Sequence, residues 1–336
     1  MSDARYGRVQ AAMARHGVGA LCLATPHLAA FASGARRVRV AGSGGTLPWV
    51  VVRAGAPSAA IFTTDPDGAP SGMPRAAVRP LAWDRDRQLA AVADLVREVP
   101  GAVACDVLTP ALRDALAGRA LVDAAPVLAE AVAPRSDAEV AAVVVALAAA
   151  RAALRAAATA VVPDGVAADV WARCADTMAE HGAGFPLHEG RVRRAGRDVL
   201  PDERFVRGDV VQLEFGLWLR EHAGIAAGTV GCDVDLSASR RRWDEALCAL
   251  ASTCRDGAST RALREAAARA GADASGLLVH GLGVGIEPPL VDLDDGADVS
   301  LRAGTILVLA PVVAGFRATR ALLVTERAHR WLEPAP

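Results

Sequence analysis

The amino-acid sequence predicts an α/β (α+β) protein with a smaller N-terminal α/β domain, residues 1–130, and a larger C-terminal domain, residues 131–336. Three observations support this prediction. The chain of 336 residues is long enough for two domains of ordinary size. Helical and β-rich segments alternate along its first third. A strong helix-start signal then begins a long Ala-rich segment near residue 136.

The first third contains short apolar runs between amphipathic segments. Residues 4–16 and 87–96 have helical periodicity, whereas the runs 20–23, 49–53, 59–63 and 103–107 have the length and composition of strands. The Gly-rich stretch 41–45 is predicted to be a loop. It does not lie between a strand and a helix with the glycine spacing of a phosphate-binding turn.

The domain boundary is predicted within residues 125–135. Ser136 and Glu139 form a capping box directly after Pro134, and they begin a helix that we expect to run to about residue 160. A second helix is predicted over 168–180. Strands at 208–219 and 226–232, helices at 239–252 and 259–271, and β segments at 277–284, 305–313 and 321–325 complete the C-terminal domain.

Composition excludes several classes of function. Hydrophobic residues make up 52% of the chain and charged residues 22%, with a net charge of −1, which is typical of a globular protein. Arginines are spread along the whole sequence, so we expect no nucleic-acid-binding groove. The sequence contains no lysine. Schiff-base chemistry on a lysine, a phosphate-binding lysine and a Ser-Lys pair are therefore excluded.

The six cysteines and the apolar segments indicate a cytoplasmic location. No two cysteines form a C-x-x-C pair, so we expect buried, reduced thiols. The first ten residues lack the apolar core of a signal peptide. The apolar run 141–150 is too short to span a bilayer, so a buried helix is predicted and no membrane association is expected.

Five short strings resemble, in order, motifs of the family of Xaa-Pro peptidases, methionine aminopeptidases and creatinase. They are PRSDAEV, GDVVQLEFG, VHGLGVGIEPP, LRAGTILVLAP and ALLVTE, and they span about residues 135–332. The resemblance implies a creatinase-like N-terminal domain followed by a "pita-bread" C-terminal domain. Fold alone does not establish a function.

The family holds two divalent metals with five side chains (Asp, Asp, His, Glu and Glu), which activate a shared water. Carried onto this chain, the resemblance retains the histidine as His280 and changes the first aspartate to Glu214. The other three positions fall near Ile225, on Ala310, and on Thr319 or Arg320. We therefore expect no metal centre and no cofactor.

Creatinase resembles the peptidases in fold but breaks a C–N bond without metal, using a histidine and carboxylates. By analogy, His280 is the candidate general acid and base, and Glu214 and Glu287 are candidate catalytic carboxylates. Glu287 stands where the family has a second histidine. His188 is a further catalytic candidate, although it lies twenty positions before Gly208. An insertion in the Arg-rich stretch 191–197 would explain that offset.

Other residues are candidates to bind a small-molecule substrate. His222 lies where the family has a tyrosine beside the site. Arg37 and Arg39 fall on the loop that, in creatinase-like homodimers, reaches the pocket of the partner subunit, and this implies a homodimer. Arg317 and Arg320 are candidates to bind substrate or to pair with Glu214 or Glu287.

Three functional hypotheses remain open from the sequence. The first is a metal-independent hydrolase that breaks a C–N bond in an amino-acid-like or amidine-like molecule. The second is a catalytically inactive pseudo-peptidase that serves as a binding module. The third is a metal-dependent Xaa-Pro aminopeptidase, which would need metals that the ligand positions do not supply. The reaction type also remains open, because a histidine and carboxylates equally serve elimination, decarboxylation or cyclisation.

Overall fold

The structure, a computed structural model, describes residues 3–34, 49–64, 66–183, 185–188, 190–273, 276–294 and 298–333. Contacts between Cα atoms divide the chain into unit 1, Met1–Val132, and unit 2, Ala133–Pro336. This division lies inside the interval predicted for the domain boundary. Arg37, Arg39 and the Gly-rich stretch 41–45 lie outside the described residues.

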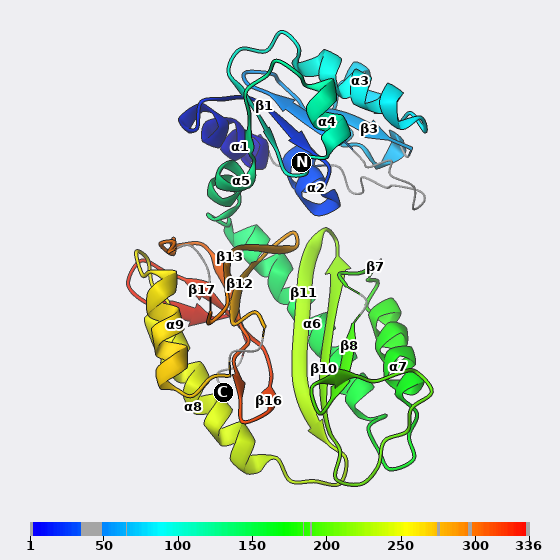
Figure 1. The fold of residues 1–336 in the computed structure, drawn as a ribbon, viewed down its shortest axis with the longest axis vertical. Coiled ribbons are helices and arrows are strands. Elements are labelled where there is room, and N and C mark those ends of the chain that lie inside the picture. The colour runs from blue at the N-terminus through cyan, green and yellow to red at the C-terminus, as the bar shows by residue number, and fades with distance from the viewer. Residues whose placement is uncertain are drawn as a thin grey trace. The chain divides into compact units, whose positions relative to one another are not determined.

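Unit 1 contains a six-stranded mixed sheet with helices around it (Figure 1). Its strand order is β4-β3-β2-β1-β5-β6, with β1 parallel to β5 and antiparallel to β2. All six side chains of β1 are buried, which explains its continuous apolar run. The elements are α1 Asp3–Arg15, β1 Val18–Leu23, α2 Pro26–Ser33, β2 Trp49–Arg53, β3 Ala60–Thr63, the 3-10 helices η1 Pro66–Gly68 and η2 Arg75–Ala77, β4 Val78–Pro80, α3 Arg85–Val96, β5 Ala102–Cys105, α4 Pro110–Ala115, β6 Leu121–Asp123 and α5 Ala125–Val132.

Unit 2 contains two five-stranded sheets and a short ribbon. The first sheet has the order β11-β10-β8-β9, with β7 also paired to β10, and the second has the order β13-β12-β14-β17-β18, while β15 pairs with β16. The elements are α6 Asp137–Ala158, α7 Ala167–Glu180, β7 Phe185–Pro186, β8 Arg191–Arg194, β9 Arg197–Asp198, β10 Val210–Leu219, β11 His222–Gly231, α8 Ser237–Thr253, α9 Thr260–Arg269, β12 Val279–Leu282, β13 Ile286–Val291, β14 Ile306–Leu309, β15 Val312–Val313, β16 Phe316–Arg317, β17 Arg320–Val324 and β18 His329–Trp331.

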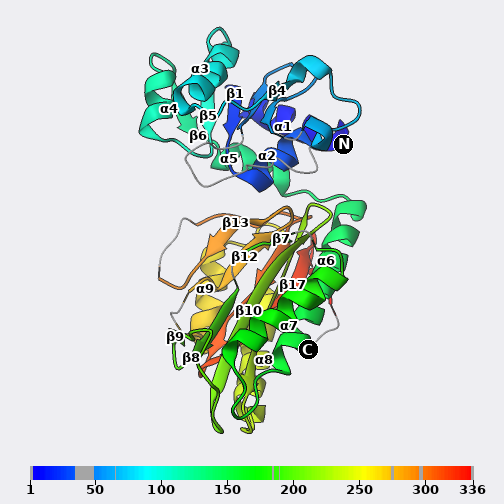
Figure 2. The ribbon, with the colours of Figure 1, turned by 90° about the vertical axis from the view of Figure 1, so that its right-hand side faces the viewer.

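Helix α6 contacts both sheets of unit 2, because three of its apolar side chains pack against Leu282, Ile306 and Val308 of the second sheet. Helices α6 and α7 cover the first sheet (Figure 2), and α8 and α9 pack on the second. The predicted capping box is present at the start of α6, where the Ser136 side chain and the Glu139 side chain each bond the other's backbone N–H. Helix α6 approaches β11 so closely that a Cβ at Gly224 would lie 2.1 Å from the carbonyl oxygen of Ala146. Only glycine fits there.

Strand β11 joins the two sheets of unit 2. The Ala223 N–H donates to the Gly283 carbonyl at 2.7 Å, and the Thr319 N–H donates to the Ala227 carbonyl at 3.2 Å. The Thr319 hydroxyl accepts a hydrogen bond from the Ala227 N–H at 2.8 Å. These bonds bring the inner faces of the two sheets together, and four of the predicted site residues lie there: His188, Glu214, His280 and Arg317.

Several predicted elements differ from the structure in their bounds. The segment predicted as one strand over 305–313 is divided into β14 and β15, because Pro311 has no N–H for the sheet. Strand β11 begins four residues earlier than predicted, at His222. The prediction that all six cysteines are buried is wrong for Cys248, which is exposed on α8, whereas the other five are buried.

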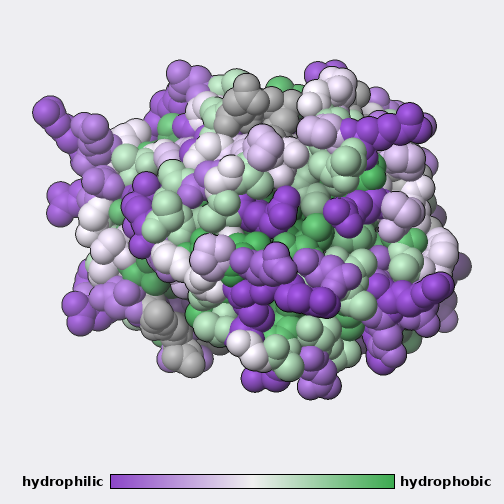
Figure 3. Space-filling model, turned by 90° about the horizontal axis from the view of Figure 1, so that it is seen from above, coloured by the Kyte–Doolittle hydropathy of each residue, from purple (hydrophilic) through white to green (hydrophobic). Residues whose placement is uncertain are grey.

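Helix α6 is longer than the apolar run that predicted it. Among the helices that the structure describes, it has the length and apolar composition needed to cross a membrane, and 44% of its most apolar window is buried. Core helices of globular proteins can have the same length and apolar composition, so this finding does not distinguish a membrane-spanning helix from a core helix. On the face of the molecule seen in Figure 3, hydrophobic areas are separated by hydrophilic side chains.

Candidate active site

Glu214 lies on the inner face of strand β10. Leu213 and Phe215 on either side of it belong to the core that packs against α6 and α7, so Glu214 points the opposite way. In the ladder with β11, Glu214 lies opposite Ala227 and Gly216 lies opposite Ile225. Opposed residues of an antiparallel pair share a face, so these side chains surround Glu214.

His188 lies beside Glu214, between strands β7 and β8. Strand β7 pairs with Leu217 and Trp218 of β10, and β8 pairs with β10 from Val211 to Glu214. This double pairing places His188 Nε2 3.9 Å from Glu214 Oε1, beyond hydrogen-bond distance. The Nδ1 atom of His188 accepts a hydrogen bond from the Gly190 N–H at 3.1 Å.

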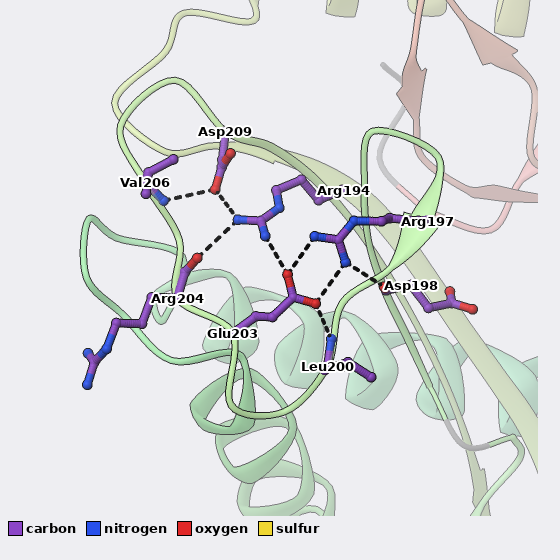
Figure 4. Close-up of polar contacts among 8 residues, drawn as sticks. All are labelled: Arg194, Arg197, Asp198, Leu200, Glu203, Arg204, Val206 and Asp209. Atoms are coloured by element: carbon purple, nitrogen blue, oxygen red, sulfur yellow. Dashed lines mark hydrogen bonds and ion pairs between the residues drawn. The ribbon is translucent and has the colours of Figure 1, made fainter.

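The described residues between His188 and Gly208 form a hairpin of β8 and β9 followed by a loop (Figure 4). Arg194 contacts Glu203 at 2.5 Å and Asp209 at 2.8 Å, while Arg197 donates two hydrogen bonds to Glu203. These bonds and the Leu200 N–H lower the pKa of Glu203 to about 2. The Arg-rich stretch is thus folded into a hairpin whose chain returns to β10, and its being an insertion relative to the family stays a prediction.

His280 approaches Glu214 from the second sheet. It lies on the interior strand β12, opposite Val308 of β14, and it is 3% exposed. Its Nδ1 atom is 2.9 Å from the carbonyl oxygen of Gly281. Burial lowers the pKa of His280, the Gly281 carbonyl and Glu214 oppose that shift, and Arg317 and His188 add to it.

Arg317 completes the cluster. Its Nη2 atom lies 2.5 Å from Glu214 Oε2. The backbone of Arg317 is held to β11, because the Thr229 hydroxyl accepts from its N–H and donates to its carbonyl, each at 2.8 Å. Burial also lowers the pKa of His188, Glu214 opposes this shift, and Arg191 and Arg317 add to it. We define His188, Glu214, His280 and Arg317 as the His-Glu-His-Arg cluster.

The three substituted ligand positions do not fit a two-metal centre. Ile225 packs in an apolar cluster with Leu282, Ile306 and Val308. Ala310 is 2% exposed, and the Thr319 hydroxyl is already bonded to Ala227. Across residues 3–333, wherever the structure describes them, no group of three or more His, Cys, Asp or Glu side chains is placed to hold a metal ion.

Glu287 has structural partners. It is 4% exposed, its Oε1 atom accepts from the Val284 N–H at 2.8 Å, and its other oxygen forms an ion pair with Arg135. The sequence had suggested Arg317 or Arg320 as its ion-pair partner. Because its carboxylate is held by Arg135 and a backbone N–H, we interpret Glu287 as a structural residue.

The remaining predicted residues lie apart from the His-Glu-His-Arg cluster. His222 is buried at the start of β11, with Nδ1 3.0 Å from the Arg220 carbonyl. Arg320 shares with Leu322 the face of β17 that packs against α8, and its Nη1 atom lies 4.0 Å from Glu333. Arg37 and Arg39 lie outside the described residues, so their roles remain predictions.

The fold is similar to that of solved Xaa-Pro peptidases. The Xaa-Pro dipeptidase from Bacillus anthracis has a TM-score of 0.76 and 18% identity, over 99% of this chain and 97% of that chain. Dipeptidase PepE from Mycobacterium ulcerans has a TM-score of 0.77 and 21% identity, over 99% and 95%. A recombinant prolidase from Thermococcus sibiricus has a TM-score of 0.79 and 14% identity, over 99% and 96%.

These similarities confirm the predicted fold. The chain has the two-domain α/β architecture of the Xaa-Pro peptidases, over the full length of both. A comparison with protein-family models finds no match, and a comparison with curated proteins finds none either. At such low identity, the similarity shows the fold and leaves the reaction to be argued from the site.

Sequence reasoning missed two residues that organise the site. Arg135 pairs with Glu287, and its signal was its place in the string PRSDAEV, the first of the five strings that carry the family resemblance. Gly190 orients His188 through a backbone N–H. No residue pattern predicts such a bond, because it depends on how the chain turns after residue 188.

Proposed function

We propose that this chain is a hydrolase that breaks a C–N bond in a small molecule by acid–base catalysis with His280, His188 and Glu214, without a dinuclear metal centre. One observation supports this proposal above the others. Near Glu214, the Nδ1 atom of His188 accepts a hydrogen bond, whereas the Nδ1 atom of His280 donates one to a carbonyl oxygen. The hydrogen-bond partners of their Nδ1 atoms therefore assign them opposite tautomers.

The partner of each Nδ1 atom determines where the ring carries its proton. His188 Nδ1 accepts from the Gly190 N–H, so the neutral ring is protonated at Nε2 and is a proton donor there. The Gly281 carbonyl can only accept, so His280 carries its proton on Nδ1. Its Nε2 then keeps a lone pair and is a base. Burial lowers the pKa of both rings, which keeps both neutral near pH 7.

This pair of tautomers suits hydrolysis. In the proposed reaction, His280 Nε2 takes a proton from water as the water oxygen attacks the carbon of the C–N bond. The imidazolium of His280 then gives this proton to the departing nitrogen, while the His188 Nε2–H donates a hydrogen bond to the negative charge that develops on the substrate. Glu214 stabilises the imidazolium that forms on His280, and Arg317 holds Glu214 in place. Both rings are neutral again once the nitrogen has left.

The proposed substrate is a small amino-acid-like or amidine-like molecule. Glu214 is the carboxylate of the His-Glu-His-Arg cluster that can receive a cationic group, since Glu287 is engaged by Arg135. Arg317 partly neutralises Glu214, so a strongly cationic substrate gains less here than it would beside two free carboxylates. A homodimer, implied by the family resemblance, and a cytoplasmic location, indicated by the cysteines, are part of this proposal. Light scattering after gel filtration tests the dimer.

The experiment is a turnover screen of small amides, ureides and amidines with chelator-treated protein. We expect His280→Gln and His188→Gln to lower kcat by at least about 100-fold, the range of a lost general base for His280 and of a lost hydrogen-bond donor to the transition state for His188. His181→Gln is the matched control, because His181 is an exposed histidine at the end of α7. Unchanged turnover of an identified substrate by His280→Gln would remove His280 from the mechanism.

A binding module is the second candidate, and one observation favours it. Ile225, Ile306 and Val308 form an apolar cluster beside the retained histidine, as expected of a site converted from chemistry to packing. If the chain is a binding module, we expect no turnover of any substrate. We also expect His188→Gln to bind the partner as tightly as the parent chain does. Metal analysis of the purified protein tests the third hypothesis, a metal-dependent Xaa-Pro aminopeptidase, because such an enzyme requires about two ions per chain.

A further inference from the structure

A second cluster of charged side chains lies on the helix-facing side of unit 2. Arg151 of α6 and Arg320 of β17 both approach Glu333, whose side chain is 4% exposed. Glu333 also accepts a hydrogen bond from the Ala321 N–H at 3.2 Å. One buried carboxylate thus serves two arginines that come from distant parts of the sequence.

The cluster continues onto helix α8. Arg240 Nε lies 3.7 Å from Asp244 Oδ2, and the charges of Arg240 and Asp244 both act on Arg320. Helix α8 begins at Leu236 without a side-chain cap, and its first turn contains no acidic residue. The positive end of the helix dipole therefore adds to the arginines.

Positive charge exceeds negative charge in this cluster. Arg155 lies one turn after Arg151 on α6, and with it the cluster comprises four arginines (Arg151, Arg155, Arg240 and Arg320) and two carboxylates (Glu333 and Asp244), which leaves an excess of two positive charges. Burial and repulsion from Arg320 and Arg155 lower the pKa of Arg151 to about 10. Burial and Arg240 likewise lower the pKa of Arg320, against the attraction of Asp244.

The Arg194–Glu203 network of Figure 4 provides the contrast within the same protein. There, hydrogen bonds from Arg197 to Glu203 raise the pKa of Arg197, so the carboxylate compensates the guanidinium. In the second cluster, the carboxylates do not outweigh burial and like-charge repulsion. In addition, Arg320 Nε and Asp244 Oδ1 are buried from solvent with no hydrogen-bond partner among the described residues.

We propose that Arg151, Arg155, Arg240 and Arg320 form a binding site for a phosphate-class dianion, either inorganic phosphate or a phosphomonoester. Two negative charges match the excess of two positive charges. The four arginines come from α6, α8 and β17, and guanidinium groups match the oxygens of a tetrahedral anion. The side chains of Arg151, Arg320 and Arg240 are 18%, 22% and 58% exposed, so an anion reaches them from solvent.

Calorimetric titration of the full chain with inorganic phosphate tests the proposal, with ionic strength held constant by sodium chloride. We expect saturable binding of one phosphate per chain. Arg240→Gln and Arg155→Gln should each lower the affinity roughly tenfold, the effect of losing one charge-assisted contact. Arg320→Gln should abolish binding. Arg240 and Arg155 are exposed, so their variants report on binding even if Arg320→Gln fails to fold.

Arg269→Gln is the matched control. It removes one positive charge from an exposed arginine of α9 in the same unit, and we expect it to leave the affinity unchanged. An equal loss of affinity in Arg269→Gln and Arg240→Gln would overturn the proposal, because binding would then follow net charge alone. Titration with glycerol phosphate shows which phosphate compound the site prefers. If this ester binds more tightly than inorganic phosphate, the ligand is a phosphomonoester, and if it binds more weakly, the ligand is inorganic phosphate. The absence of saturable binding for both ligands overturns the site.

Discussion

The imidazole of His188 lies over the backbone of Gly216, so that a Cβ at residue 216 would stand 2.9 Å from both Cδ2 and Nε2 of that ring. Real Cβ atoms do not approach other heavy atoms so closely. Gly216, the last residue of the string GDVVQLEFG, is therefore required because His188, 28 residues before it, lies against its backbone. This contact connects a motif of β10 with a side chain of the proposed active site.

Gly216→Ala should displace the His188 ring without unfolding unit 2. The added methyl group also meets the Leu187 Cβ at 2.9 Å, so the 187–188 segment must move. A shift of about 1 Å at a reacting group costs roughly 100-fold in rate. Turnover and the imidazole NMR signals of His188 measure the effect. Gly228→Ala, whose new Cβ meets only the flexible Leu154 side chain at 3.3 Å or beyond, should keep both unchanged.

Glu287→Gln should destabilise the protein rather than weaken substrate binding. The substitution removes the carboxylate charge nearest to Arg135, which is 2% exposed, and leaves the Glu139 carboxylate 4.0 Å from it. Breaking one half of a buried ion pair costs about 3–5 kcal/mol of unfolding free energy, and the remaining Glu139 carboxylate should place this variant toward the lower end. Urea denaturation measures this loss.

Glu265→Gln is the control for Glu287→Gln. It breaks an exposed pair with Arg269 at 3.9 Å and should cost less than about 1 kcal/mol. If Glu287→Gln folded as stably as the parent chain and raised KM instead, Glu287 would return to the list of substrate-binding residues.

Thr319→Val should weaken the connection between the two sheets of unit 2. It leaves the buried Ala227 N–H without the hydroxyl that accepts its hydrogen bond at 2.8 Å. An unsatisfied buried donor costs about 1–3 kcal/mol. Thr319→Ser keeps the hydroxyl and should retain most of the stability. Equal losses for valine and serine would show that the methyl group, not the hydrogen bond, stabilises this junction.

The unfolding free energy should fall as the pH drops below about 6.5, the pKa of an unperturbed histidine. Burial lowers the pKa of His27, His188, His280 and His329 in the folded chain. Below pH 6.5 the unfolded chain therefore binds more protons than the folded one, and acid favours unfolding. The histidine contribution is fully present above pH 6.5 and is lost as the pH falls through the lowered folded-state values.

Urea denaturation between pH 8 and pH 5 measures this dependence. His280→Gln removes one of the four groups and should flatten the slope below pH 6.5, whereas the exposed control His181→Gln should leave it unchanged. Over the same range, kcat/KM should fall with acid as His280 becomes protonated. A slope that is identical in His280→Gln and the parent chain would contradict the burial-driven shift.

Local signals in the sequence predicted most of the helices and the long strands. The capping box of Ser136 and Glu139, and the apolar period of 167–180, depend on neighbours within a few residues, so they can be read from the chain. Strand β13 and the short strands β7 to β9 were missed. They are stabilised by pairing with β10 and β12 rather than by their own composition.

The sequence by itself predicted the fold, because the order of the motifs suffices for it. The substituted metal-ligand positions follow from the resemblance and stay a prediction. The sequence also selected His280, Glu214 and His188 as candidates. Only the tertiary structure decided which of them meet: β10 and β12 belong to different sheets, and β11 brings those sheets together. The same packing holds Glu287 with Arg135 and turns Arg320 toward α8, since these contacts depend on the faces of strands that are distant in the sequence.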